Sequence, residues 1–212
     1  MMLTMKSGIR SIVILLVLLN LVFFMLQWLL GADFTSSFML IKGQALVRPW
    51  ILVTSMFLHN GVYHLIVNMY VLLVFGGLVE ERIGKKRFLL LYFISGIVAS
   101  FIGNFIYSAA LGASGAVFGV LGALVMVMPH LKVYPMFVPV PVRLWIVLIL
   151  FTIIDVLFFP NVAVLAHITG GIVGLLFGFW LNKQKKKFIK KFSSKKHLGS
   201  KDIDEYLRDG MV

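Results

Sequence analysis

The chain has 212 residues, of which 60% are hydrophobic, with a mean hydropathy of +1.00 and a net charge of +12. This apolar content is far above that of a soluble domain, so it excludes an ordinary soluble protein and indicates one membrane-embedded domain. There is no cysteine, which excludes disulfides, thiol nucleophiles and thiolate-bound metals.

Six apolar stretches have the length of membrane spans. A helix that crosses the hydrocarbon core needs about 20 mostly apolar residues, with roughly 17 to 25 tolerated. We therefore predict an all-α membrane protein built as a bundle of six transmembrane helices, of which the fourth and fifth are short. In chain order, the predicted spans are Ser11–Leu30, Val62–Val79, Phe88–Ala109, Gly112–Met128, Leu144–Phe159 and Val162–Leu181.

The first stretch is also compatible with the apolar part of a signal peptide. No small-residue cleavage motif follows it in Gly31–Phe34, so we expect it to remain as a span. The next segment, 31–61, is too apolar for a solvated loop and contains only about half a span. It is predicted to lie in the membrane interface, with Trp50 at headgroup level.

The basic residues predict the orientation. With six spans, nearly all Lys and Arg fall on one side, and only Lys42 and Arg48 fall on the other. The positive-inside rule then places both termini in the cytoplasm, as an even number of spans requires. The charge therefore marks a membrane face, and we expect no nucleic acid as a partner. The residues on the predicted inner side are Lys6, Arg10, Arg82, Lys85, Lys86, Arg87, Lys132, Arg143 and the basic residues from Lys183 onward.

The composition divides the chain at residue 182. Residues 1–182 contain all predicted spans and form the expected transmembrane domain. Residues 183–212 are expected to be a cytoplasmic tail, in which lysines are mixed with Phe188, Ile189 and Phe192. Such a segment is typical of contact with the anionic inner leaflet, so membrane lipids are its expected partners.

Four polar side chains interrupt the spans at one depth. His64 and Asn68 fall in the first turns of the second span, Ser114 in the first turn of the fourth, and His167 in the first turns of the sixth. These spans run in the same direction, so all four residues lie about one to two turns from the outer surface. Polar groups at such positions are unfavourable in lipid and are candidates for function.

Glycines accompany two of these residues along helical stripes. Small residues in a stripe allow two helix backbones to approach closely in lipid. If the stripes of the fourth and sixth spans meet, Ser114 and His167 come together at the outer end of the contact. The stripes are Gly115, Gly119 and Gly122 on the fourth span, and Gly170, Gly171, Gly174 and Gly178 on the sixth.

Each feature alone has a simpler interpretation. A glycine stripe is usual in packing, a serine in a span often bonds its own helix, and a histidine can join two helices. A transporter is disfavoured because the inner halves of these three spans are almost wholly apolar. A metal site of His59, His64 and His167 lacks a nearby carboxylate on those helices, so no metal is expected. The matched depth favours a catalytic site instead.

Four motifs together resemble the rhomboid family of intramembrane serine proteases, in its bacterial six-span form. The resemblance covers about residues 48–181, and the motifs fall on the second, fourth and sixth spans in the correct order. The family's Trp-Arg motif is half present, because Val47 precedes Arg48. The motifs are HNGVYHLIVN at 59–68, VEERIG at 79–84, GASG at 112–115 and AHITGG at 166–171.

This resemblance implies roles for particular residues. Ser114 would be the nucleophile and His167 the general base. His64, Asn68 and the backbone N–H of Ser114 would donate to the oxyanion. Phe118 stands where many members carry a tyrosine stacked on the histidine, and it keeps the ring. His59, Gly112 and Gly115 would support the site, and Glu80 and Arg82 would hold the turn after the second span.

The chemistry of the residues is consistent with these roles. A serine nucleophile needs a base within hydrogen-bond reach, and imidazole titrates near neutral pH. Phe118 lies one turn from Ser114 and can hold the imidazole without an acid. Asp155 could extend the pair to a triad, although capping of its helix end or contact with water is favoured. Gly112 and Gly115 would allow a substrate backbone to approach.

We therefore predict an intramembrane serine endopeptidase that needs no cofactor. It would act through an acyl-enzyme on single-pass membrane proteins, near the outer part of their transmembrane segment, where the helix must first unwind. The alternatives are an inactive rhomboid-like binding protein, which would be expected to lose the serine or the histidine, and a transporter. The compact form favours the plasma membrane of a bacterium.

Overall fold

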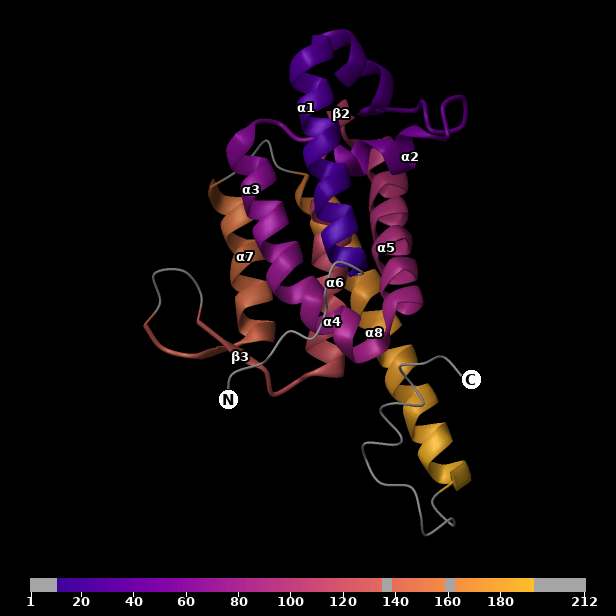
Figure 1. Ribbon diagram of the computed structural model, residues 1–212, viewed down its shortest axis with the longest axis vertical. Helices are drawn as coiled ribbons and strands as arrows, with labels where there is room; N and C mark the ends of the chain where they lie inside the picture. Colours follow the sequence, from indigo (N-terminus) through magenta and orange to yellow (C-terminus); the bar gives the residue numbers. More distant parts are fainter. Residues whose placement is uncertain (1–10, 135–138, 159–162, 193–212) are drawn as a thin grey trace.

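The computed structural model describes residues 11–134, 139–158 and 163–192, which form a bundle of helices (Figure 1). The predicted ends at Phe159 and Val162, the basic residues Lys6 and Arg10, and the tail from residue 193 lie outside these ranges. The elements are α1 (Ile12–Phe38), β1 (Leu40–Ile41), α2 (Ile51–Thr54), the 3-10 turn η1 (Ser55–Phe57), α3 (Val62–Val71), the π-helical turn η2 (Leu72–Gly76), α4 (Gly77–Ile83), α5 (Lys85–Ile106), β2 (Ala109–Ala110), α6 (Ser114–Val127), β3 (Lys132–Val133), β4 (Val142–Arg143), α7 (Leu144–Phe158) and α8 (Val164–Phe192).

The apolar helices correspond to the predicted spans. Four helical stretches in the described part of the chain are long and apolar enough to cross a membrane, and α3, η2 and α4 together form one of them, Val62–Ile83. The two other apolar helices, α6 and α7, are shorter, as expected. The fold is therefore mostly helical, and the count of six spans stays a prediction.

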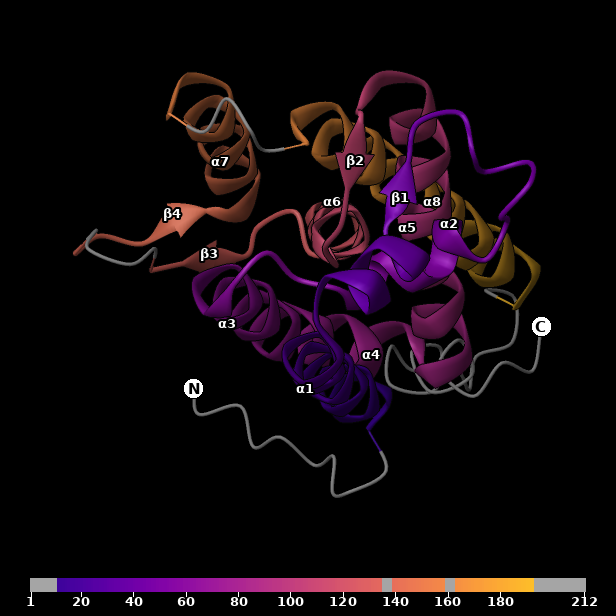
Figure 2. The ribbon, with the colours of Figure 1, turned by 90° about the horizontal axis from the view of Figure 1, so that it is seen from above.

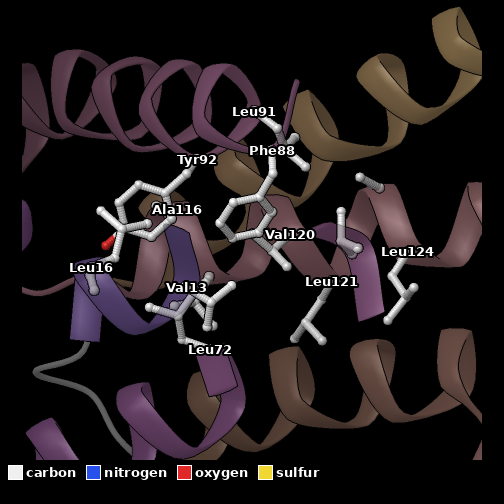
Figure 3. Close-up of a cluster of buried hydrophobic side chains, with 14 of the residues drawn as sticks. Val13, Leu16, Leu72, Phe88, Leu91, Tyr92, Ala116, Val120, Leu121 and Leu124 are labelled. Atoms are coloured by element: carbon white, nitrogen blue, oxygen red, sulfur yellow. The ribbon is translucent and has the colours of Figure 1, made fainter. Parts of the chain in front are cut away.

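Helix α6 lies at the centre of the bundle. Seen from above, α1, α3, α4, α5 and α8 surround it, and α7 stands at the periphery (Figure 2). Every residue from Gly115 to Leu124 is buried. Close packing of this kind holds helices together in lipid, where burial of apolar groups adds little. The side chains at the core are Val13, Leu16, Leu72, Phe88, Leu91, Tyr92, Ala116, Val120, Leu121 and Leu124 (Figure 3).

The first backbone N–H groups of α1 donate hydrogen bonds to a carboxylate from α4. The Ser11 hydroxyl donates to Glu80 Oε2 over 2.5 Å, and the backbone N–H groups of Ile12 and Val13 donate to Glu80 Oε1 and Oε2 over 2.9 and 3.1 Å. The first N–H groups of a helix have no intrahelical acceptor, and lipid offers none. Glu80 therefore ties the start of α1 to α4.

The segment after the first predicted span is structured rather than a loop. Helix α1 turns at Gly31, whose φ of 74° and ψ of −155° are non-helical, and then continues to Phe38. Strand β1 pairs antiparallel with β2, with Leu40 opposite Ala110 and Ile41 opposite Ala109. This pairing explains why α5 ends at Ile106 and not at Ala109, the predicted end of the third span.

Helix α8 continues beyond the predicted end of the sixth span at Leu181. The helix extends past residue 182, the predicted domain boundary, and includes the lysine-rich residues up to Phe192. Lysine and glutamine are good helix formers, so the helix can continue where the apolar composition stops. Within this part, Asn182 Nδ2 donates to the Met126 carbonyl near the end of α6 over 2.8 Å. The end of α6 far from Ser114 is thereby joined to α8.

Candidate active site

Ser114 starts α6 two residues after a glycine turn. Gly112 has a φ of +132°, and its N–H donates to the Ser55 carbonyl over 2.9 Å. A Cβ at residue 112 would lie 2.7 Å from Cε1 of His64. The turn therefore needs glycine both for its backbone conformation and for the space occupied by the imidazole. Because Ser114 is in the first turn, its own N–H has no acceptor within the helix.

The Ser114 hydroxyl is hydrogen-bonded to an imidazole from α8. Ser114 Oγ and His167 Nε2 are 2.7 Å apart, and His167 is buried. The start of α8 is fixed by a neighbouring helix end, because the Leu165 N–H donates to the Tyr107 hydroxyl over 2.8 Å. Two side chains that are 53 residues apart in the sequence thus form a serine–histidine pair.

The glycine stripes explain why these two side chains meet. A Cβ at Gly170 would lie 1.9 Å from the carbonyl oxygen of Gly115, and a Cβ at Gly174 would lie 1.9 Å from that of Gly119. Real atoms cannot come so close, so α6 and α8 pack backbone to backbone only because these residues lack side chains. The prediction that the two stripes meet is confirmed for Gly170, Gly174 and Gly178, whereas a Cβ at Gly171 would meet nothing within 4 Å.

Phe118 holds the imidazole from one side. Its ring is stacked on that of His167, with centroids 4.4 Å apart and planes inclined by 9°. The contact comes from one turn along α6 from Ser114, as the spacing predicted. Asp155, the acid considered for a triad, lies in α7, and its side chain is outside the described part of the chain.

The imidazole of His64 lies beside Gly112, two residues before Ser114. Its Nδ1 accepts the Asn60 N–H over 3.3 Å, so in the neutral ring the proton is assigned to Nε2. A Cβ at Gly112 would lie 3.0 Å from this Nε2 and 3.7 Å from Ser114 Oγ. The imidazole N–H and the hydroxyl therefore flank the same glycine.

Asn68 is buried below His64 on the same face of α3. Its Nδ2 donates to the His64 carbonyl over 2.9 Å, which occupies one of its two amide protons. The second amide N–H is the one that could donate a hydrogen bond to an oxyanion. The role of Asn68 therefore stays a prediction.

His59 lies behind His64. The two rings meet edge to face with centroids 5.1 Å apart, and only 2% of His59 is exposed. Burial and the neighbouring His64 lower the pKa of His59 to about 3, which keeps this imidazole neutral. Its backbone is held by Gln27 of α1, whose Oε1 accepts the His59 N–H over 2.8 Å and whose Nε2 donates to the His59 carbonyl over 3.4 Å.

Sequence reasoning missed Gln27, Asn60 and Tyr107. Gln27 could have been found, because an amide in an otherwise apolar span needs a partner. Asn60 lies between two predicted spans and Tyr107 near the end of one, where a polar residue is ordinary, so the sequence did not indicate that they bond to His64 and Leu165.

Beside Ser114 there is a depression of about 390 Å³. Most of its lining residues are small, among them Gly96 and Ala99 of α5 and Gly115 of α6, and Ser100 and Tyr107 add hydroxyl groups. Within residues 11–134, 139–158 and 163–192, no three His, Cys, Asp or Glu side chains are grouped so that they could hold a metal ion. The described side chains around Ser114 are a hydroxyl, an imidazole bonded to it and further hydrogen-bond donors.

Comparison with known proteins identifies the family. Residues 47–184, more than half of the chain, match the rhomboid domain. The chain is 30% identical to RHOMBOID-like protein 6, mitochondrial, of Arabidopsis thaliana over 75% of this chain and 52% of that protein. It is 29% identical to Rhomboid protein 1, mitochondrial, of Saccharomyces cerevisiae over 73% of this chain and 48% of that protein.

A bacterial relative matches a shorter region. Rhomboid protease GluP of Bacillus subtilis is 46% identical over 80 residues, which are 37% of this chain and 16% of that protein. The chain spans about half the length of the two mitochondrial relatives. With its apolar helices, its serine–histidine pair and the match over residues 47–184, the chain belongs to the rhomboid family of multi-pass membrane proteins, which includes serine proteases.

Proposed function

We propose that this protein is an intramembrane serine endopeptidase of the six-span rhomboid type. Ser114 would be its nucleophile and His167 its general base. The observation that carries the proposal is the 2.7 Å hydrogen bond between Ser114 Oγ and His167 Nε2. The ring of Phe118, stacked at 4.4 Å, supports a dyad, because it holds the imidazole without needing an acid.

In the first half of the reaction, Ser114 Oγ attacks the carbonyl carbon of the scissile peptide bond as its proton moves to His167 Nε2. The tetrahedral intermediate then collapses, the carbon–nitrogen bond breaks, and the leaving amine takes the proton from His167. The product is an ester of Ser114. A water molecule hydrolyses it in the second half, giving its proton to His167, which returns one to Ser114 Oγ.

The negative charge that forms on the former carbonyl oxygen needs donors. The backbone N–H of Ser114 is in the first turn of α6, at the positive end of the helix dipole. The Nε2–H of His64 flanks Gly112, and the remaining amide proton of Asn68 lies on the same face of α3. One such donor typically lowers the barrier by about 3 kcal/mol.

The substrates would be single-pass membrane proteins, cut near the outer part of their transmembrane segment. A helix in lipid keeps its carbonyls bonded, so only a segment that unwinds can reach Ser114. The depression beside Ser114 is lined by Gly96, Ala99 and Gly115, which supports a small side chain next to the cleaved bond.

The proposed location is the cell membrane, with both termini in the cytoplasm. The positive-inside rule supports this orientation. Residues 1–182 would be the transmembrane domain, and residues 183–212 a basic tail on the anionic inner leaflet. Membrane lipids would then be partners of the tail.

The test is labelling of the purified full chain in detergent with a fluorophosphonate probe. We expect labelling of the wild type that is lost in Ser114→Ala and in His167→Ala. Ser100→Ala, which changes a second serine beside the same depression, should label normally. Undiminished labelling of either dyad variant would contradict the proposal. A folded wild type that never labels and yet retains a single-pass protein would favour a binding function instead.

A further inference from the structure

Gln27 carries an amide in the apolar helix α1 and has no role in the proposed mechanism. Its side chain is half-buried. Helix α1 lies beside α3, which carries His64 and Asn68 (Figure 1 and Figure 2). A polar side chain in a membrane span is unfavourable unless it is bonded, and it is a candidate for function. The partners of this amide lie partly in the loop before α3.

The oxygen and the nitrogen of the Gln27 amide both have partners. Its Oε1 accepts the His59 N–H over 2.8 Å. Its Nε2 donates to the His59 carbonyl and to the Thr35 hydroxyl, each over 3.4 Å. These contacts decide which end of the amide carries the oxygen, because the reversed amide would turn an N–H toward the His59 N–H. Gln27 thus holds both peptide groups that flank His59.

The second of these peptide groups also contacts His64. Its carbonyl, from His59, accepts from Gln27 Nε2. Its N–H, from Asn60, donates to His64 Nδ1 over 3.3 Å. A peptide group is planar, so the direction of its carbonyl fixes the direction of its N–H. Gln27 therefore orients the N–H that His64 Nδ1 accepts.

The ring of His64 depends on this one hydrogen bond. Among the described residues, the Asn60 N–H is the only group that bonds a nitrogen of the ring. The imidazole of His59 meets the ring edge to face, with centroids 5.1 Å apart, and neither of its own nitrogens has a hydrogen-bond partner among those residues. The bond to Nδ1 leaves the proton of neutral His64 on Nε2, the nitrogen beside Gly112.

We propose that Gln27 is a positioning residue for His64. It holds the peptide group between residues 59 and 60, which keeps the imidazole rotated so that Nε2–H faces the negative charge formed next to Ser114. The inference rests on the proposed peptidase function, in which His64 donates to the oxyanion. Hydrogen bonds in a chain polarise one another, so the contact with Gln27 also strengthens the bond to His64 Nδ1. A donor that is fixed in advance needs no reorganisation in the transition state.

The test is a double-mutant cycle on the rate of fluorophosphonate labelling of the full chain in detergent. Gln27→Met keeps the length of the side chain and removes the amide. It should slow labelling about fivefold, the rate equivalent of one hydrogen bond. In the His64→Ala background, which lacks the positioned imidazole, Gln27→Met should have no further effect. Slowing by the same factor in both backgrounds would mean a merely structural role and would overturn the proposal, as would wild-type labelling of Gln27→Met.

Asn20→Leu is the matched control. It removes the other amide of α1, whose Nδ2 donates within the helix to the Leu16 carbonyl over 2.7 Å, and it should label like the wild type. Thr35→Val removes a partner of the Gln27 amide without changing Gln27, so it serves where Gln27→Met does not fold. It should slow labelling about twofold and have no effect in the His64→Ala background. Equal slowing by the control and by Thr35→Val would contradict the proposal.

A spectroscopic measurement separates this proposal from the peptidase proposal. Nitrogen NMR of the imidazole rings, with His64 assigned by comparison with His64→Gln, shows which ring nitrogen carries the proton. We expect the proton on Nε2 in the wild type, and a shifted Nδ1 resonance in Gln27→Met as the bond from Asn60 loosens. A wild type that shows this change but never labels contradicts the peptidase alone. A proton on Nδ1 in the wild type, or an unchanged Nδ1 resonance in Gln27→Met, overturns the role of Gln27 whatever the labelling shows.

Discussion

The ring of Phe118 lies flat on the imidazole of His167, with centroids 4.4 Å apart and planes within 9° of parallel. The imidazole is thus held by a face-to-face contact as well as by its hydrogen bond to Ser114 Oγ. A ring fixed in this way keeps Nε2 aimed at the hydroxyl, which is the geometry that proton transfer requires.

Replacement of Phe118 by leucine should therefore slow the reaction of Ser114. An aromatic contact of this kind contributes roughly 0.5–1.5 kcal/mol, so the rate of fluorophosphonate labelling should fall up to about tenfold. Phe118→Tyr keeps the ring and should label at nearly the wild-type rate. A leucine variant that labels as fast as the wild type would show that the stacking has no part in positioning the base.

Oxyanion stabilisation can be tested at His64 and Asn68. His64→Ala and Asn68→Ala should each slow cleavage of a model transmembrane substrate by about tenfold or more, because each removes a proposed donor. Thermal unfolding in detergent serves as the control for an intact fold. Folded variants that cleave at wild-type rates would remove these residues from the proposed oxyanion site.

Because α6 and α8 are in backbone contact, alanine substitutions at two glycines of α8 should have opposite effects on stability. A methyl group at Gly174 would lie 1.9 Å from the Gly119 carbonyl oxygen, whereas a methyl at Gly171 would have nothing within 4 Å. Gly174→Ala should separate the helices and lower stability by about 1–3 kcal/mol or more. Gly171→Ala should be neutral or slightly stabilising, since alanine favours helix by up to about 1 kcal/mol. Thermal unfolding midpoints in detergent compare the two, and equal midpoints would be inconsistent with the contact.

The carboxylate of Glu80 should matter more than that of its neighbour. Glu80→Gln replaces one of two acceptor oxygens by an amide that faces donors at the start of α1. We expect a loss of roughly 1–3 kcal/mol, as for other buried hydrogen bonds to a charged group. Glu81→Gln changes an exposed carboxylate and should stay within about 0.5 kcal/mol of the wild type. Chemical unfolding in mixed micelles measures both, and similar losses would argue against the cap.

His59 makes stability depend on pH. Its pKa is about 3 in the folded protein against an ordinary value of 6.5 for histidine, so between these values the unfolded chain binds a proton that the folded protein does not. Stability should therefore fall as the pH is lowered from about 6.5 toward 3, by up to about 1.4 kcal/mol per pH unit from this residue alone. His59→Gln should show a shallower decline, and His130→Gln, at an exposed position, should keep the wild-type slope. Unfolding midpoints across this pH range provide the measurement, and identical slopes for wild type and His59→Gln would exclude His59 as the cause.

The helices and the meeting of Ser114 with His167 could be predicted because both depend on local patterns. Apolar length predicts a span, and glycines at helical spacing predict which faces of two helices approach. The ends of the helices depended on distant partners instead. The second span was predicted to end at Val79, where charged residues begin, yet α4 continues to Ile83. Glu80 lies within it, bonded to Ser11 and to the start of α1.

The parts of the site that sequence reasoning missed depend on the segment 31–61. Gln27 reaches the backbone of His59, and Asn60 bonds the ring of His64, only because this segment turns back over the bundle. Its course is set by the turn at Gly31 and by the β1–β2 pairing. Neither has a periodic pattern that could be recognised in advance.

The attachment of α1 to Glu80 has a consequence for biosynthesis. Glu80 follows the hydrogen-bond donors at the start of α1 by 67 to 69 residues in the sequence. The ribosome has therefore completed α1 long before Glu80 emerges. Until then, the first amides of α1 must stay in contact with water at the membrane surface. The nascent α1 can reach its final depth only when α4 has been inserted. Insertion of α1 is therefore coupled to insertion of α4.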